Sequence, residues 1–158
     1  MQDNPADGFD AVLAQYGDMV YRLAFAYVRS KADADDIFQE VFFRYFRRAP
    51  VLKTEEHRKA WLLRVTINRA KTCLARRILP HNRPETTDTV PFSAPEMLEL
   101  HEALETLAPK YRTVLHLFYY EGYTAEEIGG LLRQKPATVR TQLTRARQKL
   151  AALLRDET

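Results

Sequence analysis

The stretch TAEEIGGLLRQKPATVRTQLTRARQKL, residues 124–150, decides the fold of the second half of the chain. It begins with Thr-x-x-Glu at 124–127, a capping box whose side chains bond the free amides of a helix start. A short helix over 125–132 and a turn at 133–135 follow from the pattern. Pro136 then suits the first position of another helix, where a backbone N–H has no partner to lose. The sequence therefore predicts two helices joined by a tight turn.

The second of these helices has two contrasting faces. Apolar residues recur every three or four positions and so share one face of a helix: Val139, Leu143, Ala146 and Leu150. The opposite face carries side chains that can bond bases or phosphates: Thr141, Thr144, Arg145 and Gln148, with Arg140 on the flank. Four basic residues and no acidic one lie in 138–150. The helix is thus built to bury one stripe and to present a basic, polar one.

This layout predicts a helix-turn-helix, in which the first helix crosses the DNA backbone and the second enters the major groove. The apolar seam would pack on the first helix, at Ile128, Leu131 and Leu132. Gly129 would allow the two helices to approach closely. Arg140 and Arg145 are suited to guanine, the threonines to a thymine methyl or a phosphate, and Arg147 or Lys149 to phosphates. Local spacing leaves a second interpretation open, a plain helical hairpin with a basic solvent face.

Charge is distributed unevenly along the 158 residues, although the net charge is only +3. Residues 57–84 hold eight Lys or Arg and no acidic residue, and residues 133–150 hold six and none. The first 43 residues hold eight acidic residues against three basic ones. Two basic blocks in an otherwise acidic chain indicate two contacts with a polyanion, most simply nucleic acid. A pair of solvated charged faces is the alternative.

The rest of the chain is also helical in pattern, and no segment alternates as a strand would. Apolar periodicity predicts helices over 9–29, 33–48 and 57–79, and further ones over 97–107 and 109–122. Asp33 is the expected cap of the second helix. The expected buried stripe of the third consists of Trp61, Leu62, Val65, Leu74 and Ile78. We predict an all-α fold.

The organisation that we predict is two small helical domains, residues 1–78 and 96–158, joined by a flexible linker over 79–95. That linker holds four of the eight prolines and no periodic apolar pattern. It is also longer than most loops within a domain.

Several classes of function are disfavoured. Cys73 is the single cysteine, which rules out an internal disulfide or a thiolate metal cluster and suits a reducing cytosol. No apolar run approaches the length of a membrane span, and no secretion signal is visible. Asp35, Asp36 and Glu40 have no histidine at helical spacing, and acids in a first turn usually serve the helix dipole. No catalytic motif is present, so we expect no enzyme, no cofactor and no metal site.

Aromatic residues crowd the second and third helices: Phe38, Phe42, Phe43, Tyr45, Phe46 and Trp61. Most are expected in the core, while a few remain available for a partner protein or for stacking on unpaired bases. Trp61 lies among Arg58, Lys59 and Arg64. It can therefore be a wall beside a single strand or, alternatively, a buried anchor.

Three ordered segments resemble the extracytoplasmic-function (ECF) sigma factors of bacterial RNA polymerase. They are DADDIFQEVFFRYFRR (33–48), HRKAWLLRVTINRAKTCLARR (57–77), and the run from LETLAPKYR (104–112) through RARQKL (145–150). The resemblance implies a region 2 helical bundle in the first domain and a region 4 helix-turn-helix in the second. It also implies a non-enzymatic transcription initiation factor, active in an envelope or environmental stress response.

The resemblance assigns residues to three contacts. The clamp helices of the largest polymerase subunit would bind Asp36, Gln39, Glu40, Phe43 and Arg44. The partly melted minus-ten element would be bound by the loop at 52–57 and by Trp61, Arg64, Asn68, Arg69, Lys71 and Thr72. Duplex DNA of the minus-thirty-five element would be read by Arg140, Thr141, Thr144, Arg145 and Arg147.

The resemblance also implies partners and a location. Core RNA polymerase would contact the chain through those clamp helices and through the flap of its second subunit, with the linker in the RNA exit region. A membrane-linked anti-sigma factor would hold the otherwise cytoplasmic protein at the inner face of the membrane. No small-molecule substrate and no cofactor is implied.

Two features depart from the family pattern. The turn has Arg133 and Gln134 where the family tends to have glycine and an apolar residue. A positive φ at Arg133 would cost about 1 kcal/mol. Gly129 and Gly130 also form a weak helix interior, at roughly 1 kcal/mol each relative to alanine.

Two other functions fit parts of the sequence. One is a stand-alone helix-turn-helix regulator, which would bind a palindromic duplex without polymerase. The other is an interaction module that keeps the fold without DNA binding, such as an anti-sigma mimic. The basic outer face of the last helix disfavours the mimic.

Overall fold

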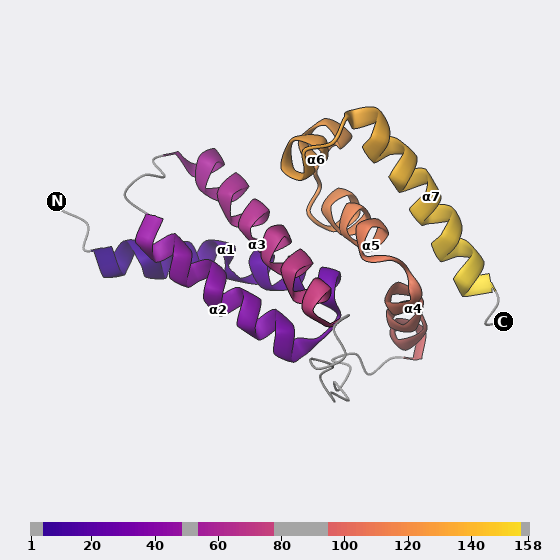
Figure 1. The fold of residues 1–158 in the computed structure, drawn as a ribbon, viewed down its shortest axis with the longest axis horizontal. Helices are drawn as coiled ribbons and strands as arrows, with labels where there is room; N and C mark the ends of the chain where they lie inside the picture. The colour runs from indigo at the N-terminus through magenta and orange to yellow at the C-terminus, as the bar shows by residue number, and fades with distance from the viewer. Residues whose placement is uncertain (1–4, 49–53, 78–94, 156–158) are drawn as a thin grey trace. The chain divides into compact units, whose positions relative to one another are not determined.

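The computed structural model describes residues 5–48, 54–77 and 95–155. Contacts divide the chain into two compact units, with the boundary along the sequence between residues 84 and 85. The regular elements in the described residues are helices (Figure 1), which confirms the all-α prediction. The predicted linker, 79–95, lies outside the described residues except for its last residue.

The first unit is a bundle of three long helices, α1 (Pro5–Val28), α2 (Lys31–Arg48) and α3 (Glu55–Arg77). Each helix packs against the other two (Figure 1). Their shared core includes the fully buried side chains of Val20, Leu23, Val28, Val41, Leu62 and Leu63. Burying an aliphatic side chain of this size contributes roughly 1.5–3 kcal/mol. Packing among long helices therefore stabilises this unit.

A tight reversal joins α1 to α2. Arg29 takes a left-handed conformation, φ 54°, and its N–H donates to the carbonyl of Phe25 at 2.8 Å. The hydroxyl of Ser30 accepts from the N–H of Asp33 at 3.3 Å. The predicted cap, Asp33, was wrong: Ser30 caps the helix and Asp33 lies in its first turn. A short hydroxyl side chain just before the helix reaches the third helical amide, which Asp33 itself supplies.

The start of α3 is also set by a hydroxyl cap. Thr54 Oγ1 accepts from the N–H of His57 at 3.1 Å, so α3 begins at Glu55 and not at the predicted residue 57. The Glu55 carboxylate accepts from Gln15 Nε2 at 2.6 Å and from Tyr16 Oη at 3.1 Å, both on α1. These bonds lower the pKa of Glu55, while burial and then the bond to Glu55 raise the pKa of Tyr16 to about 12.

The buried stripe of α3 differs from the predicted one. Its members are Leu62, Leu63, Thr66, Ile67 and Ala70, whereas Trp61, Val65 and Leu74 are half-buried and Ile78 lies outside the described residues. Of the described residues in the predicted stripe only Leu62 is buried, because the buried face is rotated around the helix and includes Leu63 and Ile67 in place of Val65 and Leu74. Thr66 can be buried because its hydroxyl donates to the carbonyl of Leu62 at 2.6 Å.

The second unit contains α4 (Pro95–Thr106), α5 (Pro109–Leu115), α6 (Ala125–Leu132) and α7 (Pro136–Arg155). The last of these, α7, packs on the other three. The segment predicted as one helix over 109–122 is not a continuous α-helix, because residues His116–Tyr120 form a π-helical turn after α5. Gly122 follows with φ 77°, a conformation that suits glycine.

A buried arginine holds α4 against α5. The Nη1 of Arg112 donates to the carbonyls of Leu104 at 3.2 Å and Leu107 at 2.6 Å. The last carbonyls of a helix have no partner within it, so the guanidinium supplies the missing donor. The buried charge thereby fixes where α4 ends.

Candidate nucleic-acid interface

Both ends of α6 have the local structure that sets up the predicted helix-turn-helix. Thr124 Oγ1 accepts from the N–H of Glu127 at 3.1 Å, and Glu127 Oε1 accepts from the N–H of Thr124 at 3.2 Å, which completes the capping box. Arg133 ends α6 in the left-handed conformation, φ 57° and ψ 45°. This arginine stores about 1 kcal/mol of strain at a position that glycine would occupy freely.

Gly129 is required by this turn. A Cβ at Gly129 would lie 2.6 Å from the carbonyl oxygen of Gln134, whose own N–H donates to the Gly129 carbonyl at 2.9 Å. The close approach that the sequence predicted therefore exists, and its nearest neighbours are the backbone of Gln134 in the turn and the backbone N of Pro136 at the start of α7, 3.5 Å from the added Cβ. At Gly130 an added Cβ would meet nothing within 4 Å.

The apolar seam of α7 is buried as predicted. Val139, Leu143 and Ala146 are buried and Leu150 is half-buried. Across from them, Ile128 is fully buried and Leu131 and Leu132 are half-buried. The opposite face of α7 must consequently point to solvent.

That outer face presents Thr141, Thr144 and Arg145, all exposed. The hydroxyls donate back to backbone carbonyls, Thr141 to Ala137 at 3.0 Å and Thr144 to Arg140 at 3.1 Å. Each hydroxyl oxygen keeps acceptor capacity for an incoming base or amide. The arrangement fits a helix laid into a major groove.

Arg140 and Arg147 belong to the flank of α7 that faces neighbouring elements. Arg140 Nη2 donates to Glu126 Oε1 on α6. The Arg147 guanidinium lies over the rings of Phe118 and Tyr119, 5.8 and 5.6 Å from their centres. Sequence reasoning missed these three partners, because Glu126 comes from α6 and the two aromatic rings from the π-helical turn after α5, and no spacing along the chain relates them to α7.

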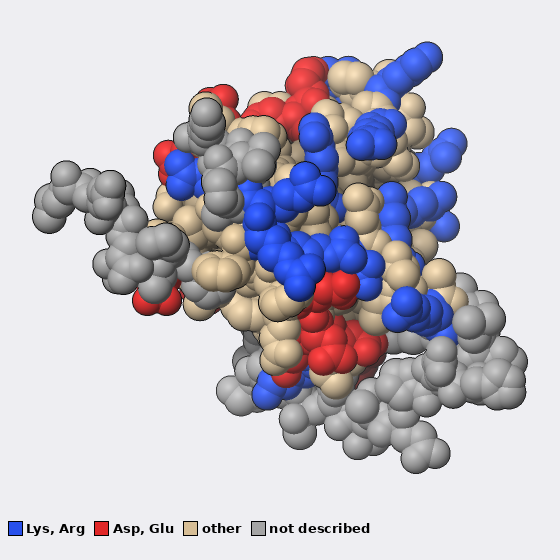
Figure 2. Space-filling view, turned by 60° about the vertical axis from the view of Figure 1, so that its left-hand side comes forward, with Lys and Arg blue, Asp and Glu red and all other residues tan. Residues whose placement is uncertain are grey.

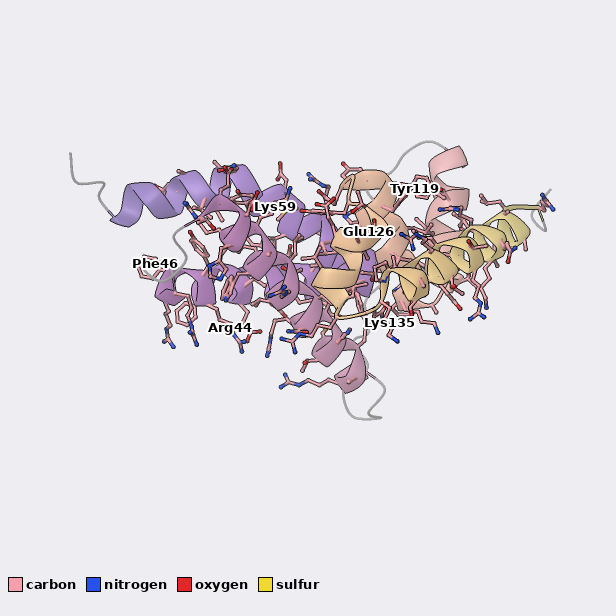
Figure 3. The ribbon with its side chains drawn as sticks, turned by 90° about the horizontal axis from the view of Figure 1, so that it is seen from above. Arg44, Phe46, Lys59, Tyr119, Glu126 and Lys135 are labelled. Atoms are coloured by element: carbon pink, nitrogen blue, oxygen red, sulfur yellow. The ribbon has the colours of Figure 1, made fainter. Side chains whose placement is uncertain are left out.

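The predicted polymerase-binding residues lie on α2, spaced so that they share one helix face. Asp36, Gln39, Phe43 and Arg44 are exposed and Glu40 is half-buried. The Phe43 side chain is 57% exposed, and the Arg47 guanidinium lies 4.5 Å from its ring centre. Figure 3 shows Arg44 and Phe46 at the edge of α2. A large exposed aromatic side chain among charges is typical of a protein-binding surface.

The predicted minus-ten residues lie on the face of α3 opposite its buried stripe. Arg64, Asn68 and Lys71 are exposed, while Trp61, Arg69 and Thr72 are half-buried. The Trp61 ring packs edge-on against Tyr45, with ring centres 5.9 Å apart. Trp61 is thus packed against the helix bundle at one side and partly accessible at the other, and its role beside a single strand stays a prediction. Of the loop at 52–57, residues 52 and 53 lie outside the described residues.

Arg69 differs from the other residues of that set. Its Nη2 donates to Glu40 Oε2 at 2.8 Å, and Glu40 Oε1 accepts from Arg44 Nη2 at 3.2 Å. One carboxylate on α2 therefore joins a predicted DNA-binding residue to a predicted polymerase-binding residue. Spacing along the sequence does not predict the contact between Glu40 and Arg69, because the two residues come from different helices.

The surface charges gather into patches of one sign (Figure 2). Within the described ranges, no group of three or more His, Cys, Asp or Glu side chains is placed to hold a metal ion. Over the same ranges, no helix has the length and apolarity to traverse a membrane. Cys73 is half-buried on α3.

Comparison with known proteins matches both units to one family. Residues 12–78 match the family model Sigma-70 region 2, and residues 97–150 match Sigma-70, region 4. The chain is 34% identical to the ECF RNA polymerase sigma factor SigE of Mycolicibacterium smegmatis over 90% of its own length and 60% of that protein. It is 30% identical to RNA polymerase sigma factor SigV of Bacillus subtilis, over 80% of this chain and 78% of SigV.

Two solved structures share the fold. The sigma factor RpoE of Bartonella quintana, in complex with the anti-sigma factor NepR, has a TM-score of 0.79 at 17% identity, covering 94% of this chain and 97% of that one. CnrH, in complex with the cytosolic domain of CnrY, has a TM-score of 0.69 at 22% identity, covering 95% and 89%.

Proposed function

This chain belongs to the ECF sigma factors, and we propose from that premise that it binds core RNA polymerase and directs it to specific promoters. The chain spans 60% of the length of the mycobacterial SigE and 78% of SigV. The activity proposed for this chain therefore rests on the exposed faces of its own helices α2, α3 and α7. As a sigma factor it acts by binding and has no catalytic role of its own.

The observation that carries the proposal is the pair of solvent-facing helix surfaces on two separate units. On α7, Thr141, Thr144 and Arg145 are exposed behind a buried seam, and on α3 Arg64, Asn68 and Lys71 are exposed behind another. A stand-alone duplex-binding regulator needs only the first surface. The match of residues 12–78 to sigma region 2 thus favours the sigma factor over that regulator and over a mimic without DNA binding.

The two surfaces would act on different forms of DNA. The face of α7 enters the major groove of the minus-thirty-five element, where each bidentate arginine–guanine contact is worth about 1–3 kcal/mol of discrimination. The face of α3 holds extruded bases of the minus-ten element, and stacking of a base on Trp61 is worth about 1–3 kcal/mol. Because this second contact exists only with unpaired bases, it favours the melted promoter.

The exposed face of α2 is the proposed contact with the clamp helices of the largest polymerase subunit. Asp36, Gln39 and Arg44 offer charges and hydrogen bonds around the exposed ring of Phe43. An apolar centre with a polar rim is the usual anatomy of such an interface. The flap of the second subunit is a further proposed contact, made by the second unit.

An anti-sigma factor is the proposed regulator. Two proteins of this fold, RpoE and CnrH, are seen in complexes with the anti-sigma factor NepR and with the cytosolic domain of CnrY. We propose that this chain works in the cytoplasm and that a membrane-linked anti-sigma factor covers its polymerase-binding or DNA-binding surface.

The direct test is transcription of sheared host genomic DNA by core polymerase with and without this protein, followed by sequencing of the RNA 5′ ends. We expect new discrete start sites that share two upstream motifs. Copurification with polymerase without new start sites would indicate an inhibitor instead. Failure both to bind polymerase and to redirect it would leave the duplex-binding regulator as the better function.

Two sets of variants separate the surfaces. Arg140→Ala with Arg145→Ala should lower initiation at the mapped promoters more than tenfold and leave polymerase binding unchanged. Lys110→Ala, which removes an exposed charge on α5, is the control. Asp36→Ala should weaken polymerase binding, whereas Asp18→Ala, an exposed acid on α1, should not. The reverse pattern would mean that the roles of the units are exchanged.

A further inference from the structure

Glu126 lies beside the DNA-directed surface without belonging to any set of contact residues. It occupies the first turn of α6, where a carboxylate is favoured by the helix dipole. The capping box is made by Glu127 and Thr124, so Glu126 is not needed for it. Figure 3 shows Glu126 on α6 and Lys135 in the turn to α7. Among the residues that the structure describes, its carboxylate has one hydrogen-bond partner, Arg140.

The pair contributes little to folding. The two side chains are 58% and 60% exposed, and exposed ion pairs contribute about 0–1 kcal/mol at most. The contact also crosses from α6 to α7, which are already held together by the buried seam and the turn. Any functional effect of Glu126 therefore acts through the Arg140 guanidinium.

A guanidinium has five N–H donors, and Glu126 accepts from one nitrogen, Nη2. Enough donors remain for a bidentate contact with guanine N7 and O6. The carboxylate also restricts a long, flexible side chain to one flank of α7, and it neutralises part of the charge that would otherwise attract any phosphate. Both effects reduce the binding of Arg140 to DNA phosphates of any sequence, and they leave its donors available for a guanine base.

We infer that Glu126 is a positioning residue that makes Arg140 selective for a base edge over the phosphate backbone. The inference rests on the proposed function, because it requires α7 to enter a major groove. Loss of the negative charge would free Arg140 to bind a phosphate, and each added phosphate contact steepens the dependence of log K on log salt by about 0.9. Affinity for arbitrary sequences would rise while preference falls.

The experiment uses the full chain with core polymerase and a pool of duplexes randomised over the upstream promoter element. Bound and free duplexes are sequenced for wild type, Arg140→Ala, Glu126→Gln and the double variant. Glu126→Gln keeps an amide oxygen as acceptor and removes only the charge. The matched control is Glu102→Gln, an exposed acid on α4 of the same unit. Binding of one fixed, unrelated duplex is titrated with salt in parallel.

The expected result is a fall of about fivefold in preference at the one base pair whose preference Arg140→Ala also removes. Binding of the unrelated duplex should tighten, with a steeper salt dependence. In the Arg140→Ala background, Glu126→Gln should change the preference no further. Glu102→Gln should match wild type.

Three outcomes would overturn the inference. If Arg140→Ala removes a preference that Glu126→Gln leaves intact, Glu126 does not position Arg140, and the proposed function stands. If Glu126→Gln acts equally in the Arg140→Ala background, its effect is general electrostatics. If the wild-type complex enriches no motif at all, the proposed function fails, and the inference with it.

Discussion

Each unit holds one arginine of its proposed nucleic-acid face against a glutamate of a neighbouring helix, and the two pairs differ in burial. Arg69 and Glu40 are 23% and 37% exposed and 2.8 Å apart, whereas Arg140 and Glu126 are 58% and 60% exposed. Water screens the exposed pair more strongly than the partly buried one. The same two residue types can therefore fasten helices in the first unit and orient a side chain in the second.

The difference extends to what stabilises each unit. Long helices around a shared core hold the first unit together, so a surface pair adds to packing that already exists. In the second unit α4, α5 and α6 are each shorter than any helix of the first unit, and the placement of α7 depends on a turn with a left-handed arginine and a glycine in backbone contact. Five predictions follow from this contrast and from the contacts within each unit, beginning with the largest expected effect.

Gly129→Ala should destabilise the second unit by more than about 2 kcal/mol, because the new Cβ would overlap the Gln134 carbonyl oxygen. Gly130→Ala is the matched control on the same helix, with open space around its Cβ, and should stabilise by about 0.5–1 kcal/mol. Hydrogen exchange of the α7 amides would report both changes. Equal protection in the two variants would show that the turn does not govern the second unit.

Alkaline pH should weaken the first unit through Tyr16. The folded state holds its phenolic proton up to a pKa of about 12, whereas an unfolded tyrosine releases it near 10. The folded state thus binds more protons in that window, and stability is lost as pH rises from about 10 to 12. Urea unfolding followed by the fluorescence of Trp61, the single tryptophan, should show the loss. Tyr16→Phe should remove that pH dependence, and a loss that persists in this variant would contradict the assignment.

Glu55 should give the opposite dependence on the acid side. The hydrogen bonds from Gln15 and Tyr16 lower the pKa of its carboxyl. Its contribution is therefore present above the ordinary glutamate pKa and is lost as pH falls through the lowered one. Glu55→Gln should flatten the acid limb of the same Trp61 unfolding curve.

Arg69→Ala should lower the unfolding free energy of the first unit by about 1 kcal/mol, because a partly buried carboxylate loses a charged hydrogen-bond partner. A double-mutant cycle with Glu40→Gln, read by urea unfolding at low and high salt, isolates the coupling between the two side chains. A coupling free energy of zero would mean that the Arg69–Glu40 pair contributes no more to stability than the exposed Arg140–Glu126 pair.

Glu126→Gln should change the unfolding free energy of the second unit by less than about 0.5 kcal/mol. Thermal unfolding by circular dichroism is sufficient to see a larger change. A loss of unfolding free energy near that of Arg69→Ala would mean that the exposed pair also stabilises helix packing, and the two pairs would then not differ in role.

The sequence alone determined those features that depend on neighbours within a few residues. The capping box at Thr124, the turn and the seam of α7 were predicted, and each is present. Hydrogen bonds at a helix start and the period of a helix are local, so the residues that make them are adjacent in the chain. The all-α fold and the family follow from the same local signals.

Tertiary structure decided the rest. It buried Thr66 in place of Trp61, set the π-helical turn after α5, and brought Glu40 to Arg69 and Glu126 to Arg140. Which face of a broadly apolar helix is buried depends on the shape of the helices packed against it. Partners from different helices meet only after that packing is complete. The spacing of residues along the chain carries no record of such pairs, and so the positions of the two arginines had to come from the folded chain.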